Sequence, residues 1–418
     1  MVLPHAVNYT EALPALPDGV TQIPVGTNPV NGQTFTAGQQ IQFDLLNRGF
    51  LVPDSMYISY AYTMVTAAAG AEWVGCPVYT PFNRLDVQVG SQTVDTIQNY
   101  NVVMHMLSNL TMDVAQKYGQ QSSFGYLNST GVPTLEQLDG RVCIDDESGS
   151  LSAPLMSILS NSDKLLPLFA MPQIRVVLTV ESIANMFTTT QVPTAFTLSN
   201  VELRYKVIDM GQEVEHAVRM MGDKIYVKSQ SFSSSSATLA AGSSGYMELV
   251  FNQRYASVKS LFAINGVGTA ASNKQFDSVD LTANTGEYSF QIGGVIYPQR
   301  PISTRNCRAQ ALQELRSAIG SVFDKTNSLA INAVEFNFSG TAAACTVSAP
   351  GKFYVGTSTE KLGSNSLLTG ISTQNSPISY RITSGQSIGT NSSTITLVVN
   401  YDAIWEIDLV NRQTAVKC

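Results

Sequence analysis

Three histidines are the only imidazole groups in the chain, and they decide whether nucleophilic or acid–base chemistry is available. They are His5, His105 and His216. A serine nucleophile needs such a base beside it, and the best candidate turn, GSSGY at 242–246, lacks the second glycine of a G-x-S-x-G elbow. His5 lies in an expected tail, His105 between two methionines of an expected helix, and His216 in an expected linker. We therefore predict no catalytic residue and no enzyme.

Two segments could in principle hold a ligand. NGVGTAAS at 265–272 loosely follows the G-x-G-x-x-A pattern of dinucleotide loops, but the polar sequence after it predicts no helix to face a pyrophosphate. Asp145, Asp146 and Glu147 could bind a hard cation, but they lack the alternating ligands and central glycine of a calcium loop. A solvated loop is the favoured interpretation of both, so we expect no cofactor and no metal.

The cysteines also argue against a metal or disulfide framework. Their number is odd, no two form a C-x-x-C pair, and no histidine lies near them in sequence. We interpret them as small hydrophobic residues in a reducing compartment. They are Cys76, Cys143, Cys307, Cys345 and Cys418.

Charge and hydropathy argue against a nucleic-acid-binding, secreted or membrane-spanning protein. The chain has 24 basic and 31 acidic residues, and its first cation is Arg48, so the basic cluster that binds nucleic-acid phosphates is absent. The first residues carry no positive charge and are broken by prolines, which is unlike a signal peptide. No apolar run reaches the length of about 18 residues that spans a membrane. We expect no direct nucleic-acid binding and no secretion through a signal peptide.

The elements that would position any site are mostly short strands. Gly, Pro, Asn and Ser clusters separate β-branched and aromatic runs, and about eight strands per half with one helix favour a sandwich over βαβ units. Only 13% of the residues are charged, against roughly 25% in soluble proteins. The clearest strands are 56–65, 174–182, 196–208, 224–232, 330–339 and 394–409.

Four short matches in the same order indicate an internal duplication. The clearest sets Val87–Gly90 (VQVG) on Phe290–Gly293 (FQIG), at an offset of 203 residues. The others are 38–47 on 242–252, 55–60 on 260–265 and 207–210 on 406–409, at offsets near 204, 205 and 199.

Each half also has one helical pattern after its matched strand. Apolar residues recur at Ile97, Tyr100, Met104, Leu107 and Val114, with Asp95 and Gln98 resembling a capping box. The second pattern runs through Leu312, Leu315, Ile319 and Val322. Between the halves, 210–223 predicts a short linking helix. Trp73 and Trp405 are interpreted as core residues, and Pro298 and Pro301 as a rigid corner bearing Arg300.

Taken together, the chain resembles a double jelly-roll major capsid protein of the lineage that includes phage PRD1 and adenovirus, with the closest resemblance to those of Polinton-like viruses and virophages. The residues that carry it are Val87–Gly90, DTIQNYNVV at 95–103 and IGGVIYPQRPI at 292–302. The pattern covers most of 25–410, and the chain looks too lean for large insertion towers. The resemblance implies an all-β fold of two tandem eight-stranded jelly rolls, each with a short flanking helix.

The same resemblance implies a role and a set of partners. Such chains form pseudo-hexagonal homotrimers that tile an icosahedral virion shell, and they meet penton proteins, minor or cement capsid proteins and, in many viruses, an internal membrane. We hypothesise that the helices at Leu107 and Leu315 pack toward a neighbouring subunit. The alternative is a receptor-binding or adhesin β-sandwich module. The expected division is an N-terminal arm at 1–24, a first jelly roll at 25–210, a linker at 211–223, a second jelly roll at 224–410 and a C-terminal tail at 411–418.

Overall fold

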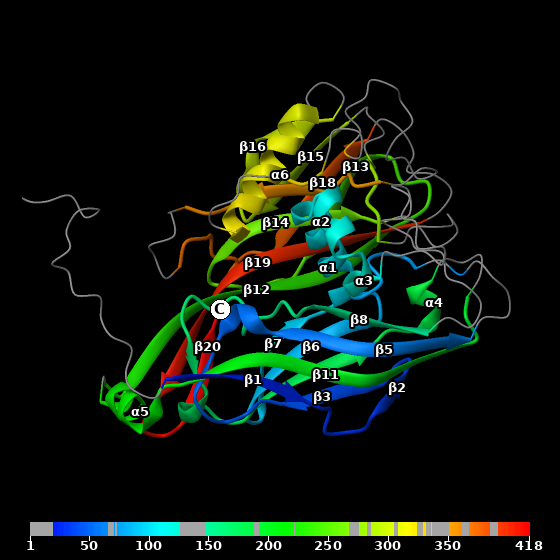
Figure 1. Cartoon of the computed structure of the whole chain (residues 1–418). Coiled ribbons are helices and arrows are strands. Elements are labelled where there is room, and N and C mark those ends of the chain that lie inside the picture. Colours follow the sequence, from blue (N-terminus) through cyan, green and yellow to red (C-terminus); the bar gives the residue numbers. More distant parts are fainter. Residues whose placement is uncertain are drawn as a thin grey trace, which may run out of the picture.

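The computed structural model describes residues 20–65, 71, 73–125, 148–187, 192–220, 222–266, 276–281, 286–304, 308–323, 329–331, 336, 351–361, 368–384 and 392–418. Within these ranges the chain builds four antiparallel sheets, two in each half (Figure 1). Side chains alternate between buried and exposed along most strands, the pattern of a sheet with one face in a core. The predicted all-β fold is confirmed.

The first half forms two facing sheets. Sheet 1 has the strand order β8-β5-β11-β4-β9, with β1 and β2 also paired to β11, and sheet 2 has the order β3-β10-β6-β7. The strands are β1 (Thr21–Thr27), β2 (Thr34–Thr36), β3 (Gln40–Asp44), β4 (Phe50–Leu51), β5 (Tyr57–Val65), β6 (Phe82–Val89), β7 (Gln92–Ile97), β8 (Ser148–Pro154), β9 (Leu166–Pro167), β10 (Ile174–Val180) and β11 (Ala195–Asp209).

The second half repeats this plan. Sheet 3 has the order β12-β19-β14-β17, with β20 also paired to β19, and sheet 4 has the order β13-β18-β15-β16. The strands are β12 (Lys224–Leu239), β13 (Gly245–Phe251), β14 (Val258–Asn265), β15 (Glu287–Ile292), β16 (Val295–Ser303), β17 (Val355–Ser358), β18 (Ile378–Ser384), β19 (Ser393–Asp408) and β20 (Gln413–Lys417).

Corresponding strands occupy the same place in each half. Sheet 2 and sheet 4 share one strand order, in which β3, β10, β6 and β7 correspond to β13, β18, β15 and β16. The matched glycines begin a two-residue hairpin loop in each half. Val89 lies opposite Gln92 and Ile292 opposite Val295, so two residues connect the strands in both cases. Gly90 and Gly293 both have φ of 60°, a left-handed conformation that suits two-residue hairpins and favours glycine.

One sequence match is out of register. With 207–210 set on 406–409, Glu202 corresponds to Tyr401, and their partners across the ladder are Ser59 and Val258. Those partners differ by 199 residues, whereas the sequence match on this strand pair used 205. The match therefore found the correct strands, β5 and β14, but slipped them by four to six residues, depending on which side of the ladder bulges is compared.

Two of the helices in the structure correspond to helices that the sequence predicted in the second half and between the halves. The second predicted helix is confirmed as α6 (Arg308–Phe323), and the linking helix as α5 (Gly211–Arg219). The remaining helical segments are α1 (Tyr100–Thr111), α2 (Val114–Gly119), α3 (Gln121–Phe124), α4 (Ile183–Met186) and the 3₁₀ turns η2 (Pro53–Ser55) and η4 (Leu168–Ala170).

The predicted capping box at Asp95 and Gln98 is wrong. Asp95 and Ile97 belong to strand β7, and α1 begins at Tyr100 after Asn99, whose φ is 46° and whose side chain makes no capping bond. The strand continues to Ile97 because Asp95 pairs with Val87 across the β6–β7 ladder. The Asp95 side chain is buried away from the start of α1, so it cannot cap the helix.

Two aromatic clusters fill the interiors. Trp73 contacts Phe187 at a ring distance of 4.6 Å in the first half, and Trp405 is fully buried in the second, as predicted. The division into arm, two jelly rolls, linker and tail stays a prediction. β1 begins at Thr21, within the expected arm, and β20 lies within the expected tail, where it pairs with Ile404–Asp408.

Candidate functional site

The residues that could have carried chemistry do not converge. His105 is buried on α1 and His216 lies on α5, while GSSGY at 242–246 leads into β13 with Gly242 at φ of 75°. His5, most of 265–272 and the acidic triplet 145–147 lie outside the described residues. Among the described residues, no group of three or more His, Cys, Asp or Glu side chains is placed to hold a metal ion.

The described cysteines carry no bond between them. Cys76 is buried and Cys418 partly buried, and neither forms a disulfide. Burial raises the pKa of the Cys418 thiol, which keeps it protonated and unreactive near neutral pH. Cys143, Cys307 and Cys345 lie outside the described residues.

A buried carboxylate joins the two halves. Asp95, on β7 of the first half, accepts hydrogen bonds from Ser231 Oγ at 2.7 Å and from Tyr401 OH at 3.0 Å, both in the second half. It also accepts from the backbone N–H of Ile158 at 3.1 Å. Burial raises the pKa of Asp95, and these bonds oppose the shift. No lysine or arginine within the described ranges forms a salt bridge with it, so hydrogen bonds alone solvate the group.

A second polar cluster, on α1, also reaches across the junction. His105 Nδ1 accepts a hydrogen bond from the backbone N–H of Cys76 at 3.1 Å, and its Nε2 lies 3.0 Å from Asn109 Nδ2. That Nε2 lies 3.5 Å from Asp277 Oδ1 in the second half. Asn109 Nδ2 donates to Tyr354 OH, again in the second half, at 3.1 Å. The sequence argues against His105 as a catalytic base, and in the structure it is buried with polar contacts to both halves.

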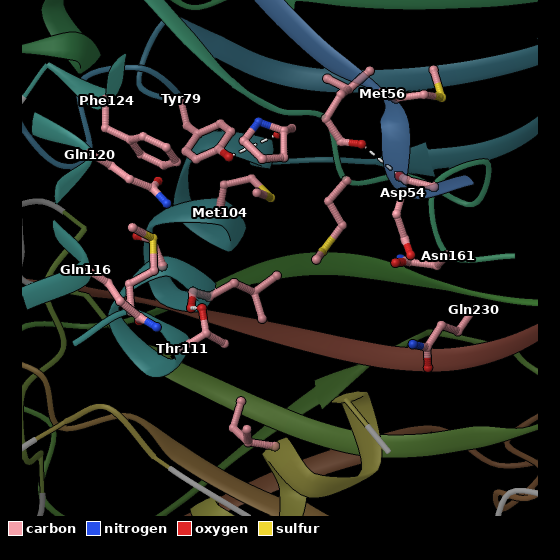
Figure 2. A pocket seen from close by; sticks show the side chains of 18 of the residues that line it. Asp54, Met56, Tyr79, Met104, Thr111, Gln116, Gln120, Phe124, Asn161 and Gln230 are labelled. Atoms are coloured by element: carbon pink, nitrogen blue, oxygen red, sulfur yellow. Dashed lines mark hydrogen bonds between the residues drawn. The ribbon is translucent and has the colours of Figure 1, made fainter. Parts of the chain in front are cut away.

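A cleft of about 790 Å³ opens beside this junction. Figure 2 shows Phe124, Gln120 and Gln116 toward one end and Asn161 and Gln230 toward the other. Methionines form much of its apolar wall: Met56, Met104, Met112 and Met156. Among the described residues that line the cleft there is no histidine, cysteine, lysine or arginine.

The helices pack inside the chain. Leu107 on α1 is 3% exposed and Leu315 on α6 is fully buried. A methyl group added to Gly356 of β17 would meet Leu315 at 3.0 Å and Ala318 at 3.2 Å, which places α6 directly on sheet 3. The hypothesis that Leu107 and Leu315 face a neighbouring subunit is therefore wrong, because their apolar side chains are already covered by their own chain.

Comparisons with known proteins agree with this architecture. No family model matches the sequence, and no curated protein matches it either. The PBCV-1 virus capsid structure matches with a TM-score of 0.59 and 8% identity, over 98% of this chain and 98% of that one. The Faustovirus major capsid protein matches with a TM-score of 0.60 and 9% identity, over 94% and 91%. The Sputnik virophage structure matches with a TM-score of 0.58 and 11% identity, over 100% and 92%.

These likenesses extend through both halves of the chain, at identities that show the fold alone. The repeated plan accounts for them, because each half pairs a larger sheet with a four-stranded sheet, and the two four-stranded sheets share one strand order. The chain has the double jelly-roll fold of viral major capsid proteins.

Proposed function

We propose that this chain is a major capsid protein, the subunit of pseudo-hexagonal homotrimers that tile an icosahedral virion shell. The observation that carries the proposal is the likeness to capsid structures over nearly the whole chain, with both jelly rolls included. Because each chain contributes two similar barrels, a ring of three chains presents six similar sides to its neighbours. A head-to-tail contact that closes after three copies also avoids open-ended fibres.

The surface chemistry supports self-assembly. With only 13% charged residues, side-by-side packing of subunits removes few ions from water, and desolvating an unpaired charge is the costly step in burying a polar surface. The proposed role is structural and not enzymatic. The proposed location is the virion, reached by assembly inside the host cell.

Further partners follow from the same role. Trimer–trimer contacts, penton proteins, minor or cement capsid proteins and an internal membrane are the proposed partners, and direct nucleic-acid binding is not proposed. No helix in the described ranges combines the length and apolar character needed to cross a bilayer. In the proposed division, 25–210 and 224–410 are the barrels of the ring, with 1–24 and 411–418 as its arm and tail.

Light scattering on a size-exclusion column tests the proposal. Three chains of 45.0 kDa form a particle of 135 kDa, and negative-stain images should show hexagonal plates. A chain that stays monomeric at all attainable concentrations contradicts the proposal. A monomer that also binds glycans supports the receptor-binding alternative.

A further inference from the structure

The outer face of sheet 3 is covered within the chain. One row across it contains Ser234, Val398, Phe262 and Gly356, which lie opposite one another on β12, β19, β14 and β17. At one end of the row, Ser234 Oγ donates to the carbonyl of Gln98, in the turn that leads from β7 into α1.

The cover extends along the rest of this face. Asn99 Nδ2 donates to Ser236 Oγ at 3.1 Å near the Ser234 end, and α6 lies on Gly356 at the other end. As a result, all eight residues of β14 are buried. The first half and α6 together therefore cover this row of sheet 3 and leave β14 without an exposed residue.

Within the part of the chain that the structure describes, the corresponding face of sheet 1 is open. Thr34, Ser199, Ala61 and Ser150 form the equivalent row across β2, β11, β5 and β8, and each is exposed or half-exposed. β5, which corresponds to the fully buried β14, alternates between buried and exposed residues along its length. Figure 1 shows β1, β2 and β11 along the lower rim of the molecule, away from α1 and α6.

Two large side chains extend this open face at the ends of β5. Tyr57 is 36% exposed and Val65 is 46% exposed. Next to Tyr57, Arg204 forms a salt bridge with Glu202 at 2.8 Å, while Lys206, two residues further on the same side of β11, is exposed. An approaching surface that covers the row from Thr34 to Ser150 and Tyr57 would bury hydroxyls, methyls and an aromatic ring.

We propose that the open face of sheet 1 is the subunit contact, and that its occupant is the second half of another copy of this chain. The inference rests on the proposed function. The internal repeat supplies the argument: sheet 3 shows how one barrel of this kind covers the outer face of the next, and sheet 1 is the same kind of surface without its cover.

The repeat also identifies the approaching segment. On sheet 3 the contact is made by the end of β7 and the turn after it, and the strand that corresponds to β7 is β16. β16 is an edge strand of sheet 4, and Gln299 and Arg300 in its corner are exposed. The contact is head-to-tail, since sheet 1 of one copy meets β16 of the next, and three such contacts close a ring of six alternating barrels.

Photo-crosslinking tests the contact directly. Benzoylphenylalanine in place of Tyr57 preserves an aromatic side chain on this face, and irradiation of the trimer should join it to the β16 region of another copy. The tryptic peptide to find is 275–305, because Arg300 precedes a proline and is not cleaved. The matched control is benzoylphenylalanine in place of Tyr246, which is 60% exposed on β13 at the opposite edge of sheet 4 and should give no such product.

A charge substitution gives an independent readout. Ala61→Arg places a cation in the middle of the open face and should leave a folded monomer where the wild type is a trimer. Gln42→Arg, on the outer side of β3, is the control and should assemble normally. A trimer that Ala61→Arg leaves intact, or crosslinks from Tyr57 to sheet 1 of the other copy, overturns this contact alone. A wild-type chain that never forms trimers overturns the proposed function as well.

Discussion

Replacing Asp95 tests whether a buried carboxylate holds the two jelly rolls together. In Asp95→Ala, the backbone N–H of Ile158 loses its acceptor, and Ser231 and Tyr401 lose theirs. A buried donor without a partner costs about 1–3 kcal/mol. The amide cannot reorient, whereas the two hydroxyls can rotate, and removing the carboxyl group relieves its own burial cost. We expect a net loss of about 2–4 kcal/mol.

The two tryptophans make the effect visible in each half. Trp73 lies in the first core and Trp405 in the second, and the chain has no others. Urea unfolding followed by fluorescence, in Trp73→Phe and Trp405→Phe backgrounds, reports each half separately. We expect the midpoints of the two halves to move apart in Asp95→Ala, because the substitution removes bonds that run between them.

Asp95→Asn is the matched control, and it also fixes the sign of the pH dependence. The amide keeps the shape, accepts from Ile158 and can donate to a hydroxyl, so its stability should lie within about 1 kcal/mol of the wild type. Because the pKa of Asp95 is raised in the folded state, its contribution is complete below the unfolded pKa of 3.8 and falls as pH rises through the folded pKa.

The wild type should therefore lose stability relative to Asp95→Asn as pH increases from 4. Two results would refute the reasoning. One is an equal loss in the alanine and asparagine variants. The other is a stability difference between wild type and Asp95→Asn that does not change with pH.

Three further predictions concern single elements. Gly90→Ala and Gly293→Ala should each lower the free energy of unfolding by about 1–2 kcal/mol, measured by thermal or urea unfolding, because both residues have φ of 60°. Gly294→Ala is the control, since no atom lies within 4 Å of the added methyl, and it should cost less. An equal loss of stability in Gly294→Ala would contradict the turn argument. Deleting 413–418 removes β20, whose Val416 lies opposite Trp405 on β19, and should lower the unfolding midpoint that Trp405 fluorescence reports. Lys417→Ala, which keeps the strand, should have little effect on this midpoint. A double-mutant cycle on Asp44 and Arg175, which pair at 2.7 Å with side chains 30% and 39% exposed, should give a coupling of about 0.5 kcal/mol that falls in high salt; a coupling that is unchanged in salt would be inconsistent with a solvated pair.

The parts of the fold that the sequence predicted are those with a local physical cause. The hairpin glycines were found because a two-residue turn requires a left-handed residue at the same place in both halves. The second helix was found because Leu312, Leu315 and Ile319 follow a helical period, and the linking helix lies between Gly211 and Gly222. Such signals depend on neighbours in sequence, so they survive in a single chain without any knowledge of its partners.

The errors and omissions have a non-local cause. Asp95 was assigned to a capping box because Gln98 follows it at the correct spacing, but its partners Ser231 and Tyr401 lie far away in the sequence. The slip between β5 and β14 arose because a strand buried on both faces, such as β14, carries no alternation to fix its register. The junction between the halves was missed entirely, since serines at 229–236 read equally well as a solvated strand.

The asymmetry between the two halves is a consequence of how a duplicated barrel is used. If both sheets that correspond to one another were covered within the chain, no equivalent surface would be left for a second copy. If both were open, each half would have to be stable without the other. Sheet 3 gains a cover from the turn between β7 and α1 and from α6, and its β14 is buried along its whole length. In contrast, β5 of sheet 1 keeps the alternating pattern of a surface strand. A chain with one covered and one open copy of the same face can extend by addition of a further chain, and ring closure then decides the number of copies.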